Sequence, residues 1–310
     1  GNHAEQVLVP RNLCCKIPNS VSDEEASFAV IGSIGLQGIR MANPNFGERY
    51  LVIGLGIIGQ ITVQLLKSNG CEVFALDTNS QRCDLANQFG ANCLHLNSYV
   101  NPIAWSEKQT NNLGFDGVIV TASTNTSDPL TLAAKVTRKK GAIVLVGTSK
   151  IELNRDIFYE KELSFQVSKS YGPGRYDPSY EDEGNDYPIQ YVRWTENRNI
   201  ESVLRALELG YLNVKPLISN RFEFDNILKA YEKLRDDSEK MGIVINYRKE
   251  KTIKQTINIK RNTKEEDFLN SENLNTGVIG CGNYFSRVIV PILKKSDFKL
   301  NTLVTQSPLR

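Results

Sequence analysis

The sequence predicts an α/β fold, a doubly wound parallel sheet with helices on both of its faces. Short apolar runs alternate with helical segments between residues 50 and 168. A glycine-rich turn joins the first apolar run to the first helical segment. Apolar runs of this kind are typical of parallel strands that are buried on both faces. Because crossovers between parallel strands are right-handed, the helices should cover both faces of the sheet.

The elements of this sheet follow from the apolar periodicity and from cap residues. Ser80 is the expected N-cap of the second helix, and Gly141 closes the third. The predicted strands occupy residues 50–53, 72–76, 92–96, 115–122, 142–146 and 163–168. The predicted helices between them occupy residues 57–68, 80–90 and 127–140.

The character of the chain changes after residue 170. Residues 171–194 are dense in Tyr, Pro, Gly and acidic side chains and are too long for an ordinary connection. Residues 248–273 have mixed charge and few large apolar side chains, so we interpret them as a linker. The remaining predicted elements are helices over 199–209 and 224–234 and strands over 242–247, 276–279 and 300–305.

Composition excludes several classes of protein. The chain has 310 residues, which at roughly 150 residues per domain indicates about two domains. A net charge of +2 is too balanced for a protein that binds nucleic acid. Neither a long apolar run nor a signal peptide is present, so no membrane association is expected.

Histidine and cysteine usage restricts the chemistry further. Only His3 and His95 are present, so a three-histidine zinc site is excluded within these residues. The six cysteines form no C-x-x-C pair, which argues against zinc-ribbon and thioredoxin-like sites. Scattered single thiols favour a reducing compartment, and we therefore expect a cytoplasmic protein.

The strongest motif is a G-x-G-x-x-G turn between a predicted strand and a predicted helix. Gly54 allows a tight turn, Gly56 lets the backbone approach a pyrophosphate, and Gly59 lets the helix pack on the strand. Ile57 and Ile58 open the helix, whose N-terminus attracts phosphate. The alternative interpretation is a glycine turn in an α/β protein that binds no nucleotide.

Asp77 completes this Rossmann fingerprint, because it ends the next strand eighteen residues after Gly59. Its carboxylate would accept hydrogen bonds from the adenosine ribose and would repel a 2′-phosphate, which favours NAD over NADP. In such folds ligands lie outside the carboxyl ends of the strands. The further cofactor-binding residues expected there are Thr121, Ala122, Gly147 and Thr148.

A second informative segment combines tyrosines, a rigid turn and arginines. A guanidinium can hold a carboxylate or phosphate through two hydrogen bonds. A tyrosine with a lowered pKa could move a proton, which makes Tyr171 and Tyr176 the candidates for catalysis. The alternative is an aromatic-anchored loop that covers the sheet or contacts another subunit. The residues expected to bind substrate are Tyr171, Arg175, Tyr176, Tyr180 and Arg193.

A second glycine turn, 277–283, also follows a predicted strand. Phe285 stands at its third-glycine position, and no acidic residue ends the next strand. The residues that follow suffice for a β-α-β unit only, so this unit is expected to be cut off and not to form a working site.

These motifs together resemble a bacterial bi-domain oxidoreductase. Residues 1–247 are similar to the later two-thirds of a medium-chain dehydrogenase/reductase, and residues 277–283 resemble the opening of a glucose-fructose oxidoreductase-type (Gfo/Idh/MocA) Rossmann domain. The match covers nearly the whole chain. The segments that carry it are His3-Ala4-Glu5, Lys16-Ile17-Pro18, Ser22–Ala26, the Gly54 turn, Phe158–Leu163, Ser170–Asp177 and Pro216-Leu217-Ile218 before Tyr231.

The resemblance implies a domain order. Residues 1–29 would end a GroES-like catalytic domain whose first part is missing, and 30–170 would form the NAD-binding Rossmann domain. Residues 171–247 would form a substrate loop and return to the catalytic domain, and 274–310 would begin a second Rossmann domain. Ala29-Val30-Ile31 stands where zinc-dependent members carry a ligand, so no catalytic zinc is expected.

The resemblance also implies an activity. We expect hydride transfer between NAD and an alcohol or ketone group of a sugar or sugar nucleotide, in surface-polysaccharide metabolism and by a homo-oligomer. One alternative is a sensor or scaffold that binds NAD without turnover. Another is a zinc-independent, quinone-reductase-like enzyme that uses NADPH, against which Asp77 argues.

Overall fold

The computed structural model describes residues 3–4, 7–97, 99–236, 241–247, 275–296 and 298–304. The chain divides into two compact units, residues 1–249 and 250–310, which we describe separately. Within the described ranges no helix is long and apolar enough to cross a membrane.

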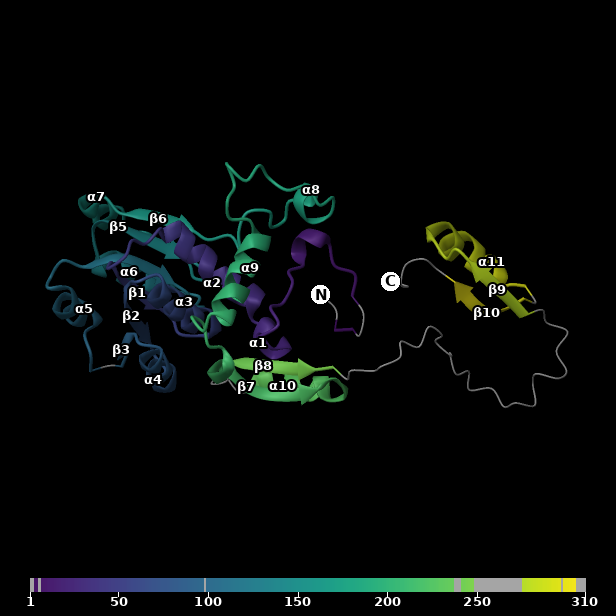
Figure 1. Cartoon of the computed structure of the whole chain (residues 1–310), viewed down its shortest axis with the longest axis horizontal. Helices are drawn as coiled ribbons and strands as arrows, with labels where there is room; N and C mark the ends of the chain where they lie inside the picture. Colours follow the sequence, from purple (N-terminus) through teal and green to yellow (C-terminus); the bar gives the residue numbers. More distant parts are fainter. Residues whose placement is uncertain are drawn as a thin grey trace. The chain divides into compact units, whose positions relative to one another are not determined.

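A six-stranded parallel sheet forms the centre of the first unit, which confirms the predicted fold class (Figure 1). The strand order is β3-β2-β1-β4-β5-β6. The chain therefore runs outward from β1 to β3 and then returns to β4 on the other side of β1, which creates a switch point between β1 and β4. The strands are β1 (Arg49–Ile53), β2 (Glu72–Asp77), β3 (Asn92–His95), β4 (Phe115–Val120), β5 (Thr137–Leu145) and β6 (Ser164–Val167).

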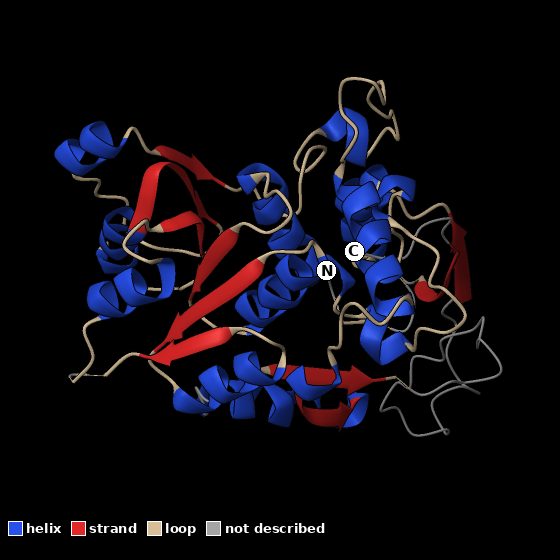
Figure 2. Cartoon of the chain, turned by 60° about the vertical axis from the view of Figure 1, so that its left-hand side comes forward, coloured by secondary structure: helices blue, strands red, loops and turns tan. Residues whose placement is uncertain are grey.

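Helices cover both faces of this sheet (Figure 2). On one face α2 (Ala29–Ala42), α3 (Ile57–Ser68) and α4 (Ser80–Gln88) pack against Val52 and Ile119. On the other face α5 (Pro102–Thr110), α6 (Asp128–Val136) and α7 (Arg155–Lys161) pack against Leu51 and Val120. Successive residues of a strand thus enter different clusters, as expected for strands buried on both faces.

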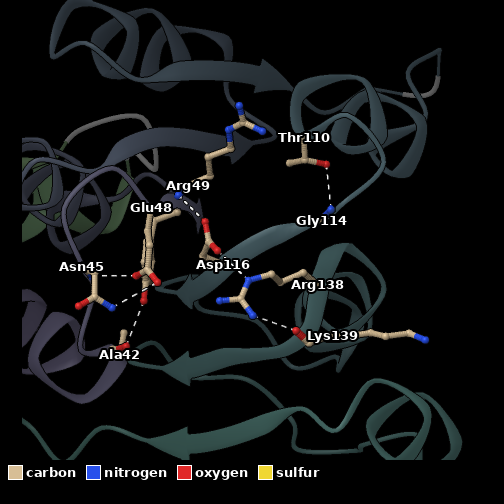
Figure 3. Close-up of polar contacts among 10 residues, drawn as sticks. Ala42, Asn45, Glu48, Arg49, Thr110, Gly114, Asp116, Arg138 and Lys139 are labelled. Carbon is tan, nitrogen blue, oxygen red and sulfur yellow. Dashed lines mark hydrogen bonds and ion pairs between the residues drawn. The ribbon is translucent and has the colours of Figure 1, made fainter.

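The helix predicted over 127–140 is too long and has to be corrected. The structure ends α6 at Val136 and begins β5 at Thr137, whose hydroxyl donates to the Ala133 carbonyl at 2.6 Å. Arg138 Nε donates to Asp116 Oδ1 at 2.7 Å, while Asp116 Oδ2 accepts from the Arg49 amide at 2.7 Å (Figure 3). The ion pair with β4 holds this stretch in the sheet, so tertiary contacts override its helical pattern.

Other element boundaries differ by a few residues. Asn79, and not Ser80, caps α4, because its side chain accepts a hydrogen bond from the Arg82 amide. The helix predicted over 199–209 is α9 (Glu196–Glu208), which Thr195 caps. The helix predicted over 224–234 consists of η3 (Phe224–Asn226) and α10 (Ile227–Asp236). Helices α5 and α7 and strand β7 (Ile218–Glu223) were not predicted from the periodicity.

The rest of the first unit flanks α2. Helix α9 crosses α2, where a Cβ built on Gly32 would lie 2.7 Å from Val203. Strand β7 pairs in parallel with β8 (Gly242–Asn246). The remaining short helices are η1 (Arg11–Leu13), α1 (Asp23–Ala26), α8 (Pro178–Glu181) and η2 (Lys215–Leu217). The assignment of residues 1–29 to a GroES-like domain stays a prediction.

The second unit contains one β-α-β arrangement among its described residues. Strand β9 (Asn275–Ile279) pairs in parallel with β10 (Lys299–Val304), and η5 (Phe285–Ile289) and α11 (Val290–Leu293) connect them. Both strands were predicted, although Thr305 lies outside the described residues. The proposed linker over 248–273 also lies outside them. The family of this unit stays a prediction.

Candidate dinucleotide site

The glycine turn lies between the end of β1 and the start of α3, as its spacing predicted. Gly54 has φ +96°, and a Cβ built on it would lie 2.6 Å from Ala122 Cα. A Cβ on Gly59 would lie 2.0 Å from the Gly54 carbonyl oxygen. In contrast, no atom of the described residues lies within 4 Å of a Cβ built on Gly56. Packing therefore requires glycine at 54 and 59, whereas Gly56 borders open space.

The N-terminus of α3 faces that open space. Gly56 is the N-cap and provides no side-chain hydrogen bond to the first turn. The first backbone N–H groups of a helix have no partner within the helix, and the helix dipole makes this end positive. Ile57 and Ile58 occupy this first turn. The arrangement suits an anionic ligand such as a pyrophosphate.

Asp77 ends β2 beside the turn. Its Oδ2 accepts from the Leu55 amide at 2.6 Å, and its Oδ1 accepts from the Asn79 amide at 2.8 Å. These two hydrogen bonds fix the carboxylate, which is 9% exposed. Each carboxylate oxygen can accept a further hydrogen bond, so Asp77 remains able to bind a hydroxyl group.

The ends of β4 and β5 complete this edge of the sheet. Thr121 Oγ1 donates to the Gly54 carbonyl at 2.5 Å. A Cβ on Gly147 would lie 2.1 Å from the Ala122 carbonyl oxygen, and Ser123 pairs with Thr148 in a parallel bridge. The structure thus brings the predicted residues at 121, 122, 147 and 148 to the same edge as the glycine turn.

A cavity of about 350 Å³ lies at this edge. Sequence reasoning missed four residues of its lining: Ile31 and Ile34 on α2, Arg82 on α4, and Met241 before β8. A basic residue in the first turn of the helix that follows the acidic end of a strand was a usable signal for Arg82. Nothing in the sequence pointed to Met241. The cavity is lined by Ile31, Ile34, Gly56, Ile57, Ile58, Arg82, Thr121 and Met241.

The tyrosine-rich segment is an ordered loop built around one arginine. Arg175 pairs with Glu181 at 2.5 Å, and its guanidinium lies over the Tyr176 ring at 3.9 Å and near the Tyr171 ring at 5.2 Å. Gly172 has φ +123° and packs on Asn199, whose amide donates to the Tyr171 carbonyl at 2.9 Å. The loop is therefore anchored to α9.

The predicted substrate residues lie in different environments within this loop. Tyr180 is 2% exposed and stacks on Tyr187 at 5.3 Å, so its ring belongs to the loop's interior. Tyr176 is 62% exposed. Burial, with Glu196 nearby, raises the pKa of Tyr171, so Tyr171 lacks the lowered pKa that the proton-transfer hypothesis requires. None of the predicted substrate residues is among those that line the cavity at the glycine turn.

Trp194, at the end of the loop, lies between two guanidinium groups. Arg40 of α2 lies 3.4 Å from the indole centroid, and Arg193 lies 4.0 Å from it. Arg40 Nε also donates to Asn199 Oδ1 at 2.7 Å. Burial and the charge of Arg193 lower the pKa of Arg40 to about 10. Arg193 is thus held at the junction of the loop with α2 and α9.

No group of three or more His, Cys, Asp or Glu side chains that could hold a metal ion occurs among the described residues. His3 hydrogen-bonds to the hydroxyl groups of Tyr247 and Tyr231, and His95 to the Thr78 carbonyl.

The core of this unit is similar to known proteins. Residues 58–182 match the family described as zinc-binding dehydrogenase. The chain is 30% identical over 236 residues to D-guloside 3-dehydrogenase of Escherichia coli K12, which covers 73% of the chain and 61% of that relative. The chain therefore spans less than two thirds of the relative's length.

Solved structures of dehydrogenases have the same fold. An alcohol dehydrogenase of Escherichia coli CFT073 complexed with NADH has a TM-score of 0.59 and 22% identity, over 74% of this chain and 61% of that one. A structure from Sinorhizobium meliloti 1021, described as a zinc-binding dehydrogenase bound to NADP, has a TM-score of 0.57 and 19% identity. The match covers 74% of this chain and 61% of that one. At these identities the likeness shows the fold alone.

Proposed function

We propose that this protein is an oxidoreductase that transfers a hydride between NAD and an alcohol or ketone group. The observation that carries the proposal is the open space at Gly56 at the N-terminus of α3, with the Asp77 carboxylate held by the amide of the preceding residue, Leu55. This space fits a pyrophosphate next to a ribose. The family match of residues 58–182 supports the same chemistry.

Each part of the site would hold a different part of the dinucleotide. The α3 N–H groups would bind the pyrophosphate, and Asp77 would accept hydrogen bonds from the adenosine ribose. Thr121, Ala122, Gly147 and Thr148 would border the path toward the nicotinamide. The bound nicotinamide supplies the hydride acceptor, and the protein orients it and excludes water.

The preference for NAD over NADP rests on Asp77. Its carboxylate is fixed by two amide donors, so it cannot turn away from a 2′-phosphate without losing both hydrogen bonds. Repulsion between the two negative charges would then weaken NADPH binding. Arg82 lines the cavity at Gly56, and its positive charge would favour a 2′-phosphate, so the affinities for the two cofactors have to be compared directly.

The proposed substrate is a sugar or sugar nucleotide in surface-polysaccharide metabolism. The similarity to D-guloside 3-dehydrogenase supports a sugar. The loop around Arg175 offers the hydroxyl groups of Tyr171 and Tyr176 and the guanidinium of Arg193 as hydrogen-bonding groups. The ring of Tyr180 is buried, so Tyr180 is not proposed to bind the substrate.

We also propose that the protein forms a homo-oligomer and is located in the cytoplasm. Size-exclusion chromatography tests the first proposal, and cell fractionation tests the second.

We also propose that the reaction does not depend on zinc. Ala29-Val30-Ile31 provides no ligand at the start of α2, where the family resemblance places one. Activity is expected to survive dialysis against a chelator, with no zinc in the purified protein by elemental analysis. Loss of activity with the chelator and recovery with added zinc would contradict this proposal.

The deciding experiment is a fluorescence titration of the protein with NADH and with NADPH. Asp77→Ala should weaken NADH binding at least tenfold, which corresponds to about 1.4 kcal/mol. It should also reduce the difference in affinity between NADH and NADPH. Asp84→Ala, on the exposed side of α4, is the matched control and should bind as the unchanged protein does. If the folded protein binds neither cofactor, the proposal fails. Binding without turnover of any sugar alcohol or sugar nucleotide would instead support a sensor or scaffold.

A further inference from the structure

Two cysteines meet behind the proposed ribose site. Cys83 lies in the first turns of α4, and Cys93 lies on β3, ten residues later. Both are free thiols, and the two thiols hydrogen-bond to each other. The other buried thiol nearby on this face, Cys71, contacts the Asn45 carbonyl at 3.9 Å instead. The proposed dinucleotide site uses neither Cys83 nor Cys93.

The backbone holds these two side chains in place. Cys83 is 3% exposed, and its Sγ lies 3.7 Å from the Asp77 carbonyl oxygen and 3.6 Å from the Leu94 carbonyl oxygen. The Cys93 amide donates to Asn87 Oδ1 of α4 at 2.9 Å. Residues 89–91 join α4 directly to β3, and the carbonyl that Cys83 Sγ contacts on β3 belongs to Leu94, the residue after Cys93.

The environment distinguishes the two sulphur atoms. The hydrogen bond from Cys93 lowers the pKa of Cys83, whereas that same hydrogen bond and burial raise the pKa of Cys93. Cys83 is therefore the better nucleophile of the pair, and Cys93 is the thiol that keeps its proton. Cys93 is also partly exposed, which provides a route for a small oxidant.

We propose that Cys83 and Cys93 form a reversible disulfide when the protein meets hydrogen peroxide. The Cys83 thiolate attacks one peroxide oxygen, the O–O bond breaks, and a sulfenic acid forms while the second oxygen leaves as water with the thiol proton. The Cys93 sulphur then displaces the sulfenic hydroxyl, which takes the Cys93 proton and leaves as a second water. The two sulphur atoms lose two electrons, and the two oxygen atoms gain them.

The disulfide would alter the proposed cofactor site, a consequence that rests on the proposed function. The Cys83 thiol contacts the Asp77 carbonyl, and Asp77 in turn fixes the Leu55 amide of the glycine turn. A covalent link from α4 to β3 removes the thiol hydrogen and draws the start of α4 toward β3. We therefore expect NADH binding to weaken about fivefold or more on oxidation.

Peptide mapping tests the disulfide independently of cofactor binding. The folded protein is treated with hydrogen peroxide, and free thiols are then alkylated in denaturant. Chymotrypsin, which cleaves after Phe89 between the two cysteines, releases the peptides, which are compared by mass spectrometry before and after reduction with dithiothreitol. A peptide pair linked through Cys83 and Cys93 that reduction separates is the expected result. Two alkylated thiols, a sulfinic acid at either position, or a link from either residue to another cysteine would overturn the proposal.

Variants separate the disulfide from its effect on the cofactor. Cys83→Ser and Cys93→Ser should each abolish the linked peptide, and a far-ultraviolet circular dichroism spectrum checks that each one folds. Cys71→Ser is the matched control and should still form the link. In the unchanged protein NADH affinity should fall with peroxide and recover with dithiothreitol. A disulfide that forms without changing NADH affinity would contradict the coupling to Asp77, whereas no NADH binding in the reduced protein would contradict the proposed function.

Discussion

Among the single residues of this protein, Glu196 has an unusual environment for a charged side chain. It is the first residue of α9, and its side chain is fully buried. Neither carboxyl oxygen has a hydrogen-bond partner among the described residues. Burial, together with the charge of Glu181, raises the pKa of Glu196 to about 7. The carboxyl group is therefore protonated in the folded state at mildly acidic pH.

This raised pKa predicts that stability falls as the pH rises. Between the ordinary pKa of 4.5 and about 7, the folded state binds a proton that the unfolded state releases, so the free energy of unfolding decreases with increasing pH. Glu196→Gln should remove this dependence and stabilise the protein by about 1–3 kcal/mol at pH 8. Urea unfolding at pH 5 and pH 8 measures both effects. Glu208→Gln, at the exposed end of the same helix, should leave the pH dependence unchanged.

Two glycines of the same turn should respond differently to alanine. Gly56→Ala adds a methyl group to open space, so we expect unchanged stability and NADH affinity lowered at least tenfold, about 1.4 kcal/mol. Gly59→Ala places its methyl group 2.0 Å from the Gly54 carbonyl, so the protein should lose about 1–3 kcal/mol of stability. Thermal unfolding and NADH titration of both variants measure this contrast. Equal loss of stability in both would show that Gly56 is also required by packing.

At the residue scale, sequence patterns predicted the residues whose spacing is fixed within one β-α-β unit. They missed residues that reach the site from far away in the sequence. The glycines and Asp77 have a fixed spacing because one β-α-β unit holds them all. Met241 reaches the cavity from the start of β8, far along the chain, and no local pattern records that contact. Tyr180 likewise has a partner far away in the sequence, Asn12, whose side-chain amide donates to the Tyr180 carbonyl at 2.8 Å.

Elements follow the apolar pattern except where a tertiary contact decides the boundary. Strands β1, β2 and β4 were predicted closely because both of their faces are buried. The stretch from Thr137 to Lys140 has helix-forming residues and nevertheless belongs to β5, held by the Asp116–Arg138 pair shown in Figure 3. Such a pairing between segments that are separate in sequence leaves no periodic signal.

The Asp116 contact predicts a measurable loss when it is removed. Asp116→Ala leaves the Arg49 amide without its carboxylate partner and frees Arg138, so unfolding free energy should fall by about 1–3 kcal/mol. Glu72→Ala removes the exposed Arg49–Glu72 pair and is the control, with an expected effect of about 0–1 kcal/mol. Urea unfolding compares the two. A smaller effect for Asp116 than for Glu72 would contradict the anchoring role.

At the scale of the whole molecule, the two glycine turns differ in the structure that surrounds them. The first lies at the edge of a six-stranded sheet, whereas the described part of the second unit pairs only β9 with β10. The sequence could predict both turns from spacing. The resemblance of the second turn to a glucose-fructose oxidoreductase-type Rossmann domain stays a prediction, because a Cβ built on Gly280 or Gly282 would meet no atom of the described residues within 4 Å and packing therefore does not test it.

This division predicts that the first unit carries the cofactor site by itself. All residues that line the cavity at Gly56 lie before residue 248. A shortened protein of residues 1–247 should fold and bind NADH with an affinity within about twofold of that of the full chain, since a twofold change is less than RT. Loss of NADH binding by a folded shortened protein would show that the second unit contributes to the site. Circular dichroism verifies folding before the titration.

The two arginines next to Trp194 should affect the fluorescence of its indole ring. An indole between two cationic planes experiences a strong local field, and its emission depends on their distance. Arg40 belongs to α2 and Arg193 to the loop, so any movement of that loop away from α2 separates the stack. The other tryptophan, Trp105, packs against Phe74 and Phe115 on the opposite face of the sheet. With Trp105 replaced by phenylalanine, the emission wavelength of Trp194 would report, without an added label, whether the tyrosine-rich loop moves away from α2 in solution.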